Sequence, residues 1–446
     1  MKTRSEINFA RLLLALACVC ATAFAQGKYS IKLTLDKADG NYNVGETANV
    51  KLLLEKDGQP FTEAKAQYSL NWEQGAPSKG DVQLGKEGGN VSFKFEKPNR
   101  AQLDVSVLDA EGKALQDNDG KPLSASIGAV AGLETYSPHL EEPADFMAFW
   151  QNTIAELKKV PIEVQKLEPV PEEAIRVNQR IFNVFDIRIR SLGDIPVSGY
   201  LAVPKNAVPG KHPAMLNIPG AGASGVTLSN LKTYKNYICL DIGVHGLDNN
   251  REKEYYVNAK KSIFISRGIN DKETYYFRNM FMRVLRALEY LKSRPEWDGR
   301  NLVVQGWSQG GFLTTMAAAL DPQVSMIMSG ITAGCDFGRP LHGLPNSWPS
   351  PITVKDGKPV NPKAAETARY YDACFFARRI KCEAYYAIGL LDKSCTATYT
   401  AYNQINAKKS IRLHPTLGHA RTCNNLDFLK RVYAIGNEAE KAIMPH

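Results

Sequence analysis

The stretch Gly306-Trp307-Ser308-Gln309-Gly310-Gly311 decides the fold of this chain, because it places a serine between small residues directly after the apolar run Leu302-Val303-Val304. A serine hydroxyl attacks an acyl carbon only when it is exposed on a sharp turn from strand to helix, and glycines tolerate the crowding there. Residues 312–320 are typical of the helix that follows. The motif alone is moderately specific, since small and polar residues also gather in ordinary turns. The surrounding pattern must therefore decide.

The chain around this motif alternates short apolar strands with helical patterns. Residues 181–191 and 197–203 predict a hairpin, and further strands are predicted at 214–218, 237–242, 302–305, 324–331, 384–390 and 411–413. A helix is predicted over 273–292, where four apolar residues recur at helical spacing: Phe277, Phe281, Leu285 and Leu288. An antiparallel start followed by repeated strand–helix units is typical of a mostly parallel, doubly wound sheet with its site at the carboxyl ends of the strands. We therefore predict an α/β domain over residues 140–446.

The residues before this domain follow a different pattern. Between residues 29 and 130, short alternating runs are separated by turn pairs such as Asp57-Gly58 and Glu111-Gly112. Period-two alternation at this spacing predicts an all-β sandwich of immunoglobulin-like type over residues 27–130. We expect it to be a spacer or a wall of the neighbouring site, with carbohydrate binding as the alternative.

The first 25 residues begin with basic side chains, continue as an apolar run and close on Ala23-Phe24-Ala25. This order is typical of a cleaved signal peptide, and the run is too short to cross a bilayer. We expect an exported protein, periplasmic or extracellular, without a membrane span; a lipidated Cys18 is the weaker alternative. The net charge of +9 is spread over basic pairs that alternate with acids, which argues against a nucleic acid partner.

Six cysteines follow the leader, and their spacing is not that of a zinc site. Export permits disulfides, and Cys395 and Cys423 each lie just past a residue assigned below to catalysis, so a bridge between them is one hypothesis. Buried free thiols are the alternative. We expect neither a metal nor a cofactor.

A serine becomes a strong nucleophile when an imidazole takes its proton and a carboxylate fixes the imidazole tautomer. Asp392 follows the predicted strand over 384–390, and His419 follows the last strand and precedes a helical pattern over 426–438. The order Ser308, Asp392, His419 is that of the α/β-hydrolase fold. We predict that these three residues form a catalytic triad on that fold.

Other residues compete for two of these roles. Asp336 is the rival acid, because it also lies beyond a strand that follows the serine. Asp392 taken alone is more typical of a helix cap or turn acid, but its position at a strand end between the serine and His419 favours the catalytic role. Only His419 lies after the last strand and directly ahead of the terminal helical pattern. Three further histidines stay open as candidates for the base: His245, His342 and His414.

Two backbone N–H donors must converge on the oxyanion that forms during acyl transfer. One is expected from Gln309, directly after the serine, and the other from Ala221 in the glycine-rich loop 219–225, for which a merely flexible loop is the alternative. Aromatic residues at helix or strand positions are more often part of a core than in contact with a sugar. The candidates for contact with substrate are Trp307, Tyr275 and His245.

Further stretches resemble the acetyl xylan esterase and cephalosporin C deacetylase family, carbohydrate esterase family seven. The resemblance extends over roughly the last three hundred residues and includes 143–150, 275–278 and 291–296. The most specific stretch is Gly389-Leu390-Leu391-Asp392 followed by Cys395. The resemblance places the serine, aspartate and histidine of the family at Ser308, Asp392 and His419, and its oxyanion donors at Ala221 and Gln309. It implies a serine esterase that deacetylates xylo-oligosaccharides or related sugars through an acetyl-enzyme, without a cofactor.

Three positions depart from the family pattern. Gly243-Val244-His245 stands where members usually carry Arg-Gly-Gln, Ala420 follows the histidine in place of Glu, and Ala221 replaces Tyr. A backbone N–H survives a change of side chain, so the oxyanion hole is retained while acyl and sugar specificity stays open. The family form is a single-domain, ring-shaped hexamer; the added amino-terminal sandwich argues against that ring, and an oligomer stays open. A peptidase of the same fold and a glycan-binding protein that has lost activity are the other functions considered.

Overall fold

The computed structural model describes residues 28–222, 224–262 and 265–443. The predicted signal peptide, residues 1–25, lies outside them. The described residues contain no helix that is both long and apolar enough to span a bilayer.

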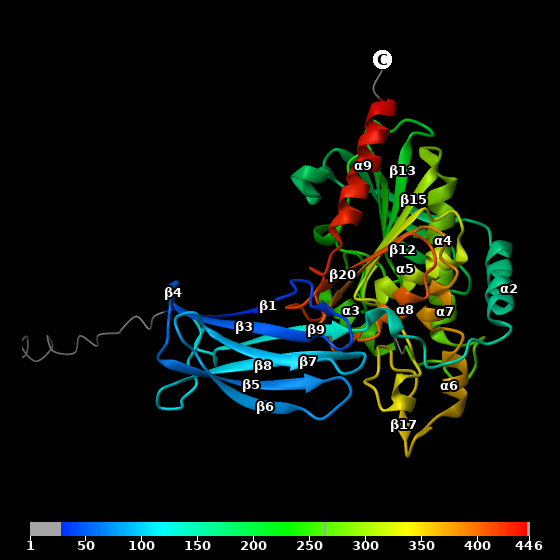
Figure 1. Ribbon diagram of the computed structural model, residues 1–446. Coiled ribbons are helices and arrows are strands. Elements are labelled where there is room, and N and C mark those ends of the chain that lie inside the picture. The colour runs from blue at the N-terminus through cyan, green and yellow to red at the C-terminus, as the bar shows by residue number, and fades with distance from the viewer. Residues whose placement is uncertain (1–27, 223, 263–264, 444–446) are drawn as a thin grey trace, which may run out of the picture.

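The first part of the chain forms two β-sheets that pack face to face (Figure 1). One sheet consists of β1 (Tyr29–Leu35), β3 (Thr47–Lys56), β4 (Gln59–Pro60) and β7 (Gly89–Lys94), with β3 pairing the other three. The second runs in the order β2 (Asn41–Tyr42), β9 (Ser124–Ala131), β8 (Asn99–Asp109), β5 (Ala64–Trp72) and β6 (Ser78–Gln83). Alternate apolar residues of both sheets meet in one core, as the period-two pattern requires. The immunoglobulin-like type of this sandwich stays a prediction.

The rest of the chain is built on a nine-stranded sheet in the order β10-β11-β12-β14-β13-β15-β16-β19-β20. The strands β10, β11, β12 and β14 pair antiparallel in succession, and the other pairs are parallel. The predicted antiparallel start and parallel continuation are therefore confirmed. The strand bounds are β10 (Val164–Pro169), β11 (Phe182–Ile189), β12 (Val197–Pro204), β13 (His212–Ile218), β14 (Ile238–Gly243), β15 (Trp297–Trp307), β16 (Met326–Gly330), β19 (Glu383–Gly389) and β20 (Lys409–His414).

Helices cover both faces of this sheet (Figure 1). On one face α2 (Phe146–Lys159), α4 (Tyr276–Ser293), α5 (Gln309–Leu320) and α7 (Ala373–Ala377) share a large apolar core with the strands. On the other face α9 (Leu426–Ile443) packs over a second core. The remaining elements lie in the connections: α3 (Lys253–Ser262), α6 (Pro362–Ala368), α8 (Thr398–Asn403), β17 (Val354–Lys355), β18 (Lys358–Pro359), η1 (Leu133–Thr135), η2 (Glu172–Ala174), η3 (Val177–Gln179), η4 (Leu228–Asn230) and η5 (Arg339–His342).

The predicted helix over 273–292 is observed as α4, which begins at Tyr276. It starts later than the pattern suggests because Tyr275 has an extended backbone (φ −61°, ψ 132°), and the Tyr276 N–H donates to the carbonyl of Arg267 in the preceding loop. The helix after the serine starts earlier than expected, at Gln309.

The hypothesis of a bridge between Cys395 and Cys423 is wrong, because all six described cysteines are free thiols. Cys395 is buried in the core beside α5, whereas Cys423 belongs to the core under α9, on the opposite face of the sheet. Burial raises the pKa of the Cys423 thiol to about 11 and that of Cys395 well above its usual range, which favours the protonated, unreactive form.

Candidate active site

Ser308 stands on a sharp turn between β15 and α5. Its backbone has φ 59° and ψ −120°, a conformation that L-residues rarely adopt and that marks strain at functional sites. The Ser308 N–H donates to the carbonyl of Gly330 at 2.9 Å, which ties the turn to the neighbouring strand β16. A Cβ on Gly306 would collide with the backbone of Gly310, and a Cβ on Gly310 with the carbonyl of Ile218. The two glycines are therefore what allows the strand and helix to close around the serine.

His419 lies in the loop after β20 and faces the serine. Its Nε2 is 3.0 Å from Ser308 Oγ, and its Nδ1 is 2.9 Å from Oδ2 of Asp392. Asp392 is fully buried, and its Oδ1 accepts the N–H groups of Ser394 at 2.7 Å and Cys395 at 3.0 Å. The structure thus brings together the three residues predicted as a triad.

The charge of Asp392 sets the protonation behaviour of His419. The hydrogen bond from the imidazole to Asp392 raises the pKa of His419, and this outweighs the opposite effect of partial burial. A neutral imidazole held by a carboxylate at Nδ1 presents an unprotonated Nε2. That nitrogen is the one that faces Ser308 Oγ, so the arrangement is suited to take a proton from the hydroxyl.

The two expected oxyanion donors both adjoin the serine. Gln309 is the first residue of α5, where a backbone N–H has no acceptor within its own helix. Ala221 is exposed in the loop after β13. A Cβ on the preceding residue, Gly220, would lie 3.9 Å from Ser308 Cβ, so this loop runs beside the nucleophile. Their convergence on one oxygen atom stays a prediction.

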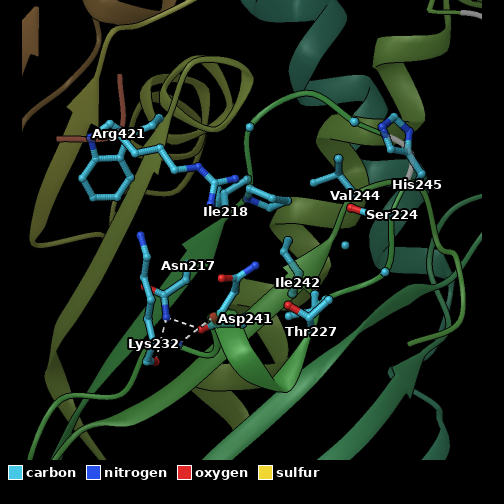
Figure 2. A pocket seen from close by; sticks show the side chains of 18 residues that line it. Asn217, Ile218, Ser224, Thr227, Lys232, Asp241, Ile242, Val244, His245 and Arg421 are labelled. Carbon is cyan, nitrogen blue, oxygen red and sulfur yellow. Dashed lines mark hydrogen bonds between the residues drawn. The ribbon is translucent and has the colours of Figure 1, made fainter. Parts of the chain in front are cut away.

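A pocket opens next to the serine, between the loop after β13 and the ends of β13 and β14 (Figure 2). It encloses about 780 Å³ of space, open solvent at its mouth included. Trp307 lines it and is oriented by a hydrogen bond from its Nε1 to the carbonyl of Cys423 at 2.8 Å. One of the three departures from the family pattern, Gly243-Val244-His245, also lines the pocket.

His245 is held at one end of this pocket by Tyr276, whose hydroxyl is 2.7 Å from His245 Nδ1. Burial lowers the pKa of His245 to about 4, so the ring is neutral at ordinary pH. Tyr275, by contrast, is only 3% exposed and packs edge-on against Tyr371 with ring centroids 4.8 Å apart. Tyr275 is therefore a core residue that the structure does not bring to the pocket, and its neighbour Tyr276 makes the contact instead.

The rival residues are engaged elsewhere. Asp336 Oδ2 is 2.8 Å from His139 Nδ1, and its Oδ1 accepts the backbone N–H of His139 at 2.8 Å. The ring of His342 lies 4.7 Å from that of His139, and His414 Nε2 donates to the carbonyl of Asn424 at 3.0 Å. Within the described residues, none of these histidines is hydrogen-bonded to the serine.

One contact to the triad comes from the amino-terminal sheets, which the sequence predicts to be a spacer or a wall of the neighbouring site. Arg100, on β8, donates from Nη1 to the backbone carbonyl of Asp392 at 2.8 Å. Its other terminal nitrogen is 3.8 Å from Glu73, which in turn pairs with Arg339 at 2.6 Å. The side chains of Glu73 and Arg339 are 1% and 0% exposed, so this ion pair is buried between the two parts of the chain.

The amino-terminal sheets also contact the segments next to Asp392 and His419. Gly128 of β9 donates its N–H to the carbonyl of Pro415 at 2.7 Å, and a Cβ at this position would lie 2.6 Å from Leu390 Cβ. Leu390 and Leu413 share a small apolar core with Val130 and Leu133. The sheets therefore rest directly on the segments that lead to Asp392 and His419.

Asp392, Cys395 and His419 are also a set of three metal-ligating side chains whose ligand atoms lie within 4.8 Å of one another. Two of them already satisfy each other by a hydrogen bond. The third is a buried thiol whose pKa is raised, whereas a metal binds the thiolate. The set is therefore better suited to proton transfer than to binding a metal.

The sequence pattern of the acetyl xylan esterase (AXE1) family matches residues 129–431. The chain belongs to this family. An acetyl esterase of Xylanibacter ruminicola, Axe7A, is 30% identical over 399 residues, which cover 86% of this chain and 85% of that protein. The predicted resemblance is thereby confirmed, and with it the assignment of the chain as a carboxylic ester hydrolase.

Two solved structures show the same fold as the larger part of the chain. An acetyl xylan esterase from Paenibacillus sp. R4 superposes with a TM-score of 0.54 at 23% identity, over 69% of this chain and 98% of that one. Acetyl xylan esterase 1 from Thermoanaerobacterium sp. JW/SL YS485 gives a TM-score of 0.55 at 21% identity, over 69% and 97%. The nine-stranded sheet and its helices thus form an α/β-hydrolase fold.

Proposed function

We propose that this esterase is exported and deacetylates acetylated xylo-oligosaccharides or related sugars with a Ser308–His419–Asp392 triad. The observation that carries the proposal is the pair of contacts made by one imidazole, 3.0 Å to Ser308 Oγ and 2.9 Å to Asp392 Oδ2. Nucleophile, base and orienting acid are then in contact in the order that acyl transfer needs. The names of the family and of its relatives support acetyl as the acyl group and xylan as the substrate class.

In the first half of the reaction, Ser308 Oγ attacks the acetyl carbonyl carbon while His419 Nε2 takes the hydroxyl proton. The carbonyl oxygen becomes an oxyanion, which the backbone N–H groups of Ala221 and Gln309 stabilise. The intermediate collapses as His419 gives the proton to the departing sugar oxygen. The free sugar hydroxyl leaves, and the acetyl group stays on Ser308.

In the second half, water replaces the sugar. His419 takes a proton from the water as the water oxygen attacks the acetyl carbon, and it returns that proton to Ser308 Oγ when the ester breaks. Acetate leaves and the serine is restored. Throughout, Asp392 holds the tautomer of His419 and stabilises the imidazolium that forms in each half.

The amino-terminal sandwich has a positioning role in this proposal. Arg100 contacts the backbone of Asp392, and Gly128 contacts the segment that follows β20. A buried ion pair such as Glu73–Arg339 fixes register between packed surfaces more than it adds stability. We therefore treat the sandwich as a wall that holds the acid loop in place, and Trp307 and His245 as the pocket residues nearest to the substrate.

A panel of three substrates tests the proposed function. The wild-type protein is expected to release acetate from acetylated xylo-oligosaccharides and from an aryl acetate, and to leave a peptide anilide intact. Hydrolysis of the anilide would favour a peptidase. Binding of the oligosaccharide without acetate release would favour a glycan-binding protein that has lost activity.

A further inference from the structure

The pocket beside the serine carries two cations on the side nearest the triad. Lys232 rises from its floor, and Arg421 enters it from the loop that follows His419 (Figure 2). Arg421 comes two residues after His419, and Trp307, which lines the same pocket, directly precedes Ser308. A charged group on a substrate held at Ser308 would therefore meet these cations first.

Neither cation forms an ion pair within the described part of the chain. The Lys232 ammonium lies over the Trp307 ring, 4.0 Å from its centroid, and no carboxylate there forms an ion pair with it. Arg421 is exposed and has no ion pair or hydrogen bond to the described residues. Buried ammonium groups normally have an acceptor, so a half-buried lysine without one is poised to receive an anion from outside.

One carboxyl group, Asp241, lies near Lys232. Burial lowers the pKa of Lys232 to about 8, and Asp241 opposes that shift, so the ammonium form predominates at neutral pH. Asp241 also lines the pocket, although little of it is exposed, and it accepts the backbone N–H of Lys232 at 3.0 Å and a hydrogen bond from the Asn217 amide. Burial raises the pKa of Asp241, which favours its neutral form. The far end of the pocket is formed by His245, which is neutral. The lining of the pocket thus contains two cationic side chains, one largely buried acid whose neutral form is favoured, and a neutral histidine.

The shape of the two cations indicates which anion fits. A guanidinium presents paired N–H donors that match the two oxygens of a carboxylate, and a nearby ammonium adds a point charge. In an oligosaccharide of pyranose sugars, a uronic acid unit supplies such a carboxylate without any added substituent. Building on the proposed function, we propose that Arg421 and Lys232 bind the carboxylate of a uronic acid unit carried by the acetylated oligosaccharide, so that the enzyme prefers acidic to neutral substrates.

A matched pair of substrates tests this preference. One is an acetylated xylo-oligosaccharide with a single uronic acid unit, and the other is the same oligosaccharide with that carboxyl group reduced to an alcohol. For the wild-type enzyme at low salt, we expect kcat/KM for acetate release to be about tenfold higher on the acidic member, mainly through KM. The ratio should fall as salt is added, because an exposed charge contact is screened.

Arg421→Gln and Lys232→Met should each bring this ratio toward one, and the double variant should abolish the preference. The ratio is measured within one variant, so a general loss of activity or stability cancels. Lys235→Gln is the matched control: Lys235 is exposed and pairs with Glu440 outside the pocket, so the tenfold ratio should be kept. A wild-type ratio of one, or a ratio unchanged in Arg421→Gln, would overturn the proposal.

Failure of the proposed function gives a different result. If neither substrate releases acetate while an aryl acetate is hydrolysed, sugar deacetylation is wrong, and the pocket is then tested by inhibition. The deacetylated acidic oligosaccharide should compete with the aryl acetate about tenfold more strongly than its reduced counterpart. Equal inhibition by the two would refute the carboxylate site independently.

Discussion

Two histidine–aspartate pairs of nearly identical geometry stand among the described residues, and of these two only one faces a serine. His419 and Asp392 are joined at 2.9 Å, and His139 and Asp336 at 2.8 Å, each through Nδ1 and a carboxylate oxygen. In both pairs the aspartate is fully buried and the histidine is partly exposed, by 38% and 25%. The difference lies beyond the ring, where His419 meets Ser308 Oγ and His139 meets the ring of His342.

The second carboxylate oxygen also distinguishes the two pairs. In Asp392 it accepts N–H groups from the turn that follows it, Ser394 and Cys395, so the carboxylate is oriented by its own loop. In Asp336 it accepts the backbone N–H of His139, which lies 197 residues away. The first arrangement aims a carboxylate at an imidazole, whereas the second fastens two distant segments. A histidine–aspartate pair thus indicates a catalytic base only when a nucleophile stands at the other nitrogen.

Removal of the serine that the first pair faces is expected to have the largest effect on kcat. Ser308→Ala should lower kcat for an aryl acetate by at least about 10⁴-fold, because the other two triad groups have no proton to transfer without it. Steady-state hydrolysis measures the loss, and an unchanged thermal unfolding midpoint shows that the variant is folded. Full activity in Ser308→Ala would disprove the mechanism.

The two aspartates can be compared directly. Asp392→Asn should lower kcat by about 10³- to 10⁴-fold, because an amide no longer holds the required tautomer of His419. Asp336→Asn should keep kcat within a few-fold while lowering the free energy of unfolding by about 1–3 kcal/mol, since a buried carboxylate loses its charged hydrogen bonds. Denaturant unfolding and aryl acetate hydrolysis are measured on both variants. Equal losses of kcat would remove the distinction between the pairs.

A smaller effect is expected where the sandwich contacts the first pair. Arg100→Met removes the donor to the Asp392 carbonyl and should lower kcat about three- to tenfold, at a nearly constant KM. Arg100→Lys should restore part of kcat, because an ammonium can also donate to that carbonyl. Lys94→Met, at an exposed position of the same sheets, is the control and should have no effect. A change confined to stability, or to KM, would refute a positioning role for Arg100.

The smallest effect concerns pH. His419 must be neutral to accept a proton, so kcat/KM falls as the pH drops through its pKa. Because Asp392 raises that pKa, the midpoint of the acidic limb should lie above the usual histidine value of about 6.5. The residual activity of Asp392→Asn should show this limb at lower pH, whereas His139→Gln should leave it in place. If the midpoint of the acidic limb were unchanged in Asp392→Asn, the assignment of His419 as the base would be contradicted.

The parts of the site that follow local sequence rules could be predicted from the sequence. The elbow at Ser308 follows from glycine spacing, and the positions of Asp392 and His419 follow from strand order, because parallel strands bring their carboxyl ends to one edge. Arg100 left no such signal, since 292 residues separate it from Asp392 and its strand shows only ordinary alternation. Lys232 and Arg421 were equally hidden, because each sits in an irregular loop whose path depends on packing.

Two errors have the same origin. Tyr275 and Tyr276 are adjacent, and the sequence does not reveal which of them faces the core, because the start of α4 sets the direction of both side chains. Cys395 and Cys423 follow catalytic positions that are close in space, yet they point to opposite faces of the sheet. In both cases the direction of a side chain at the end of an element was decided by tertiary packing.

The central claim is that Ser308 carries the acetyl group between the two halves of the reaction. Rapid acid quenching during turnover of an aryl acetate, followed by peptide mass spectrometry, tests it most directly. The account predicts one acetyl group on the peptide that contains Ser308, lost in Ser308→Ala and retained in Asp336→Asn. An acetyl group on another residue, or steady turnover in Ser308→Ala, would contradict it.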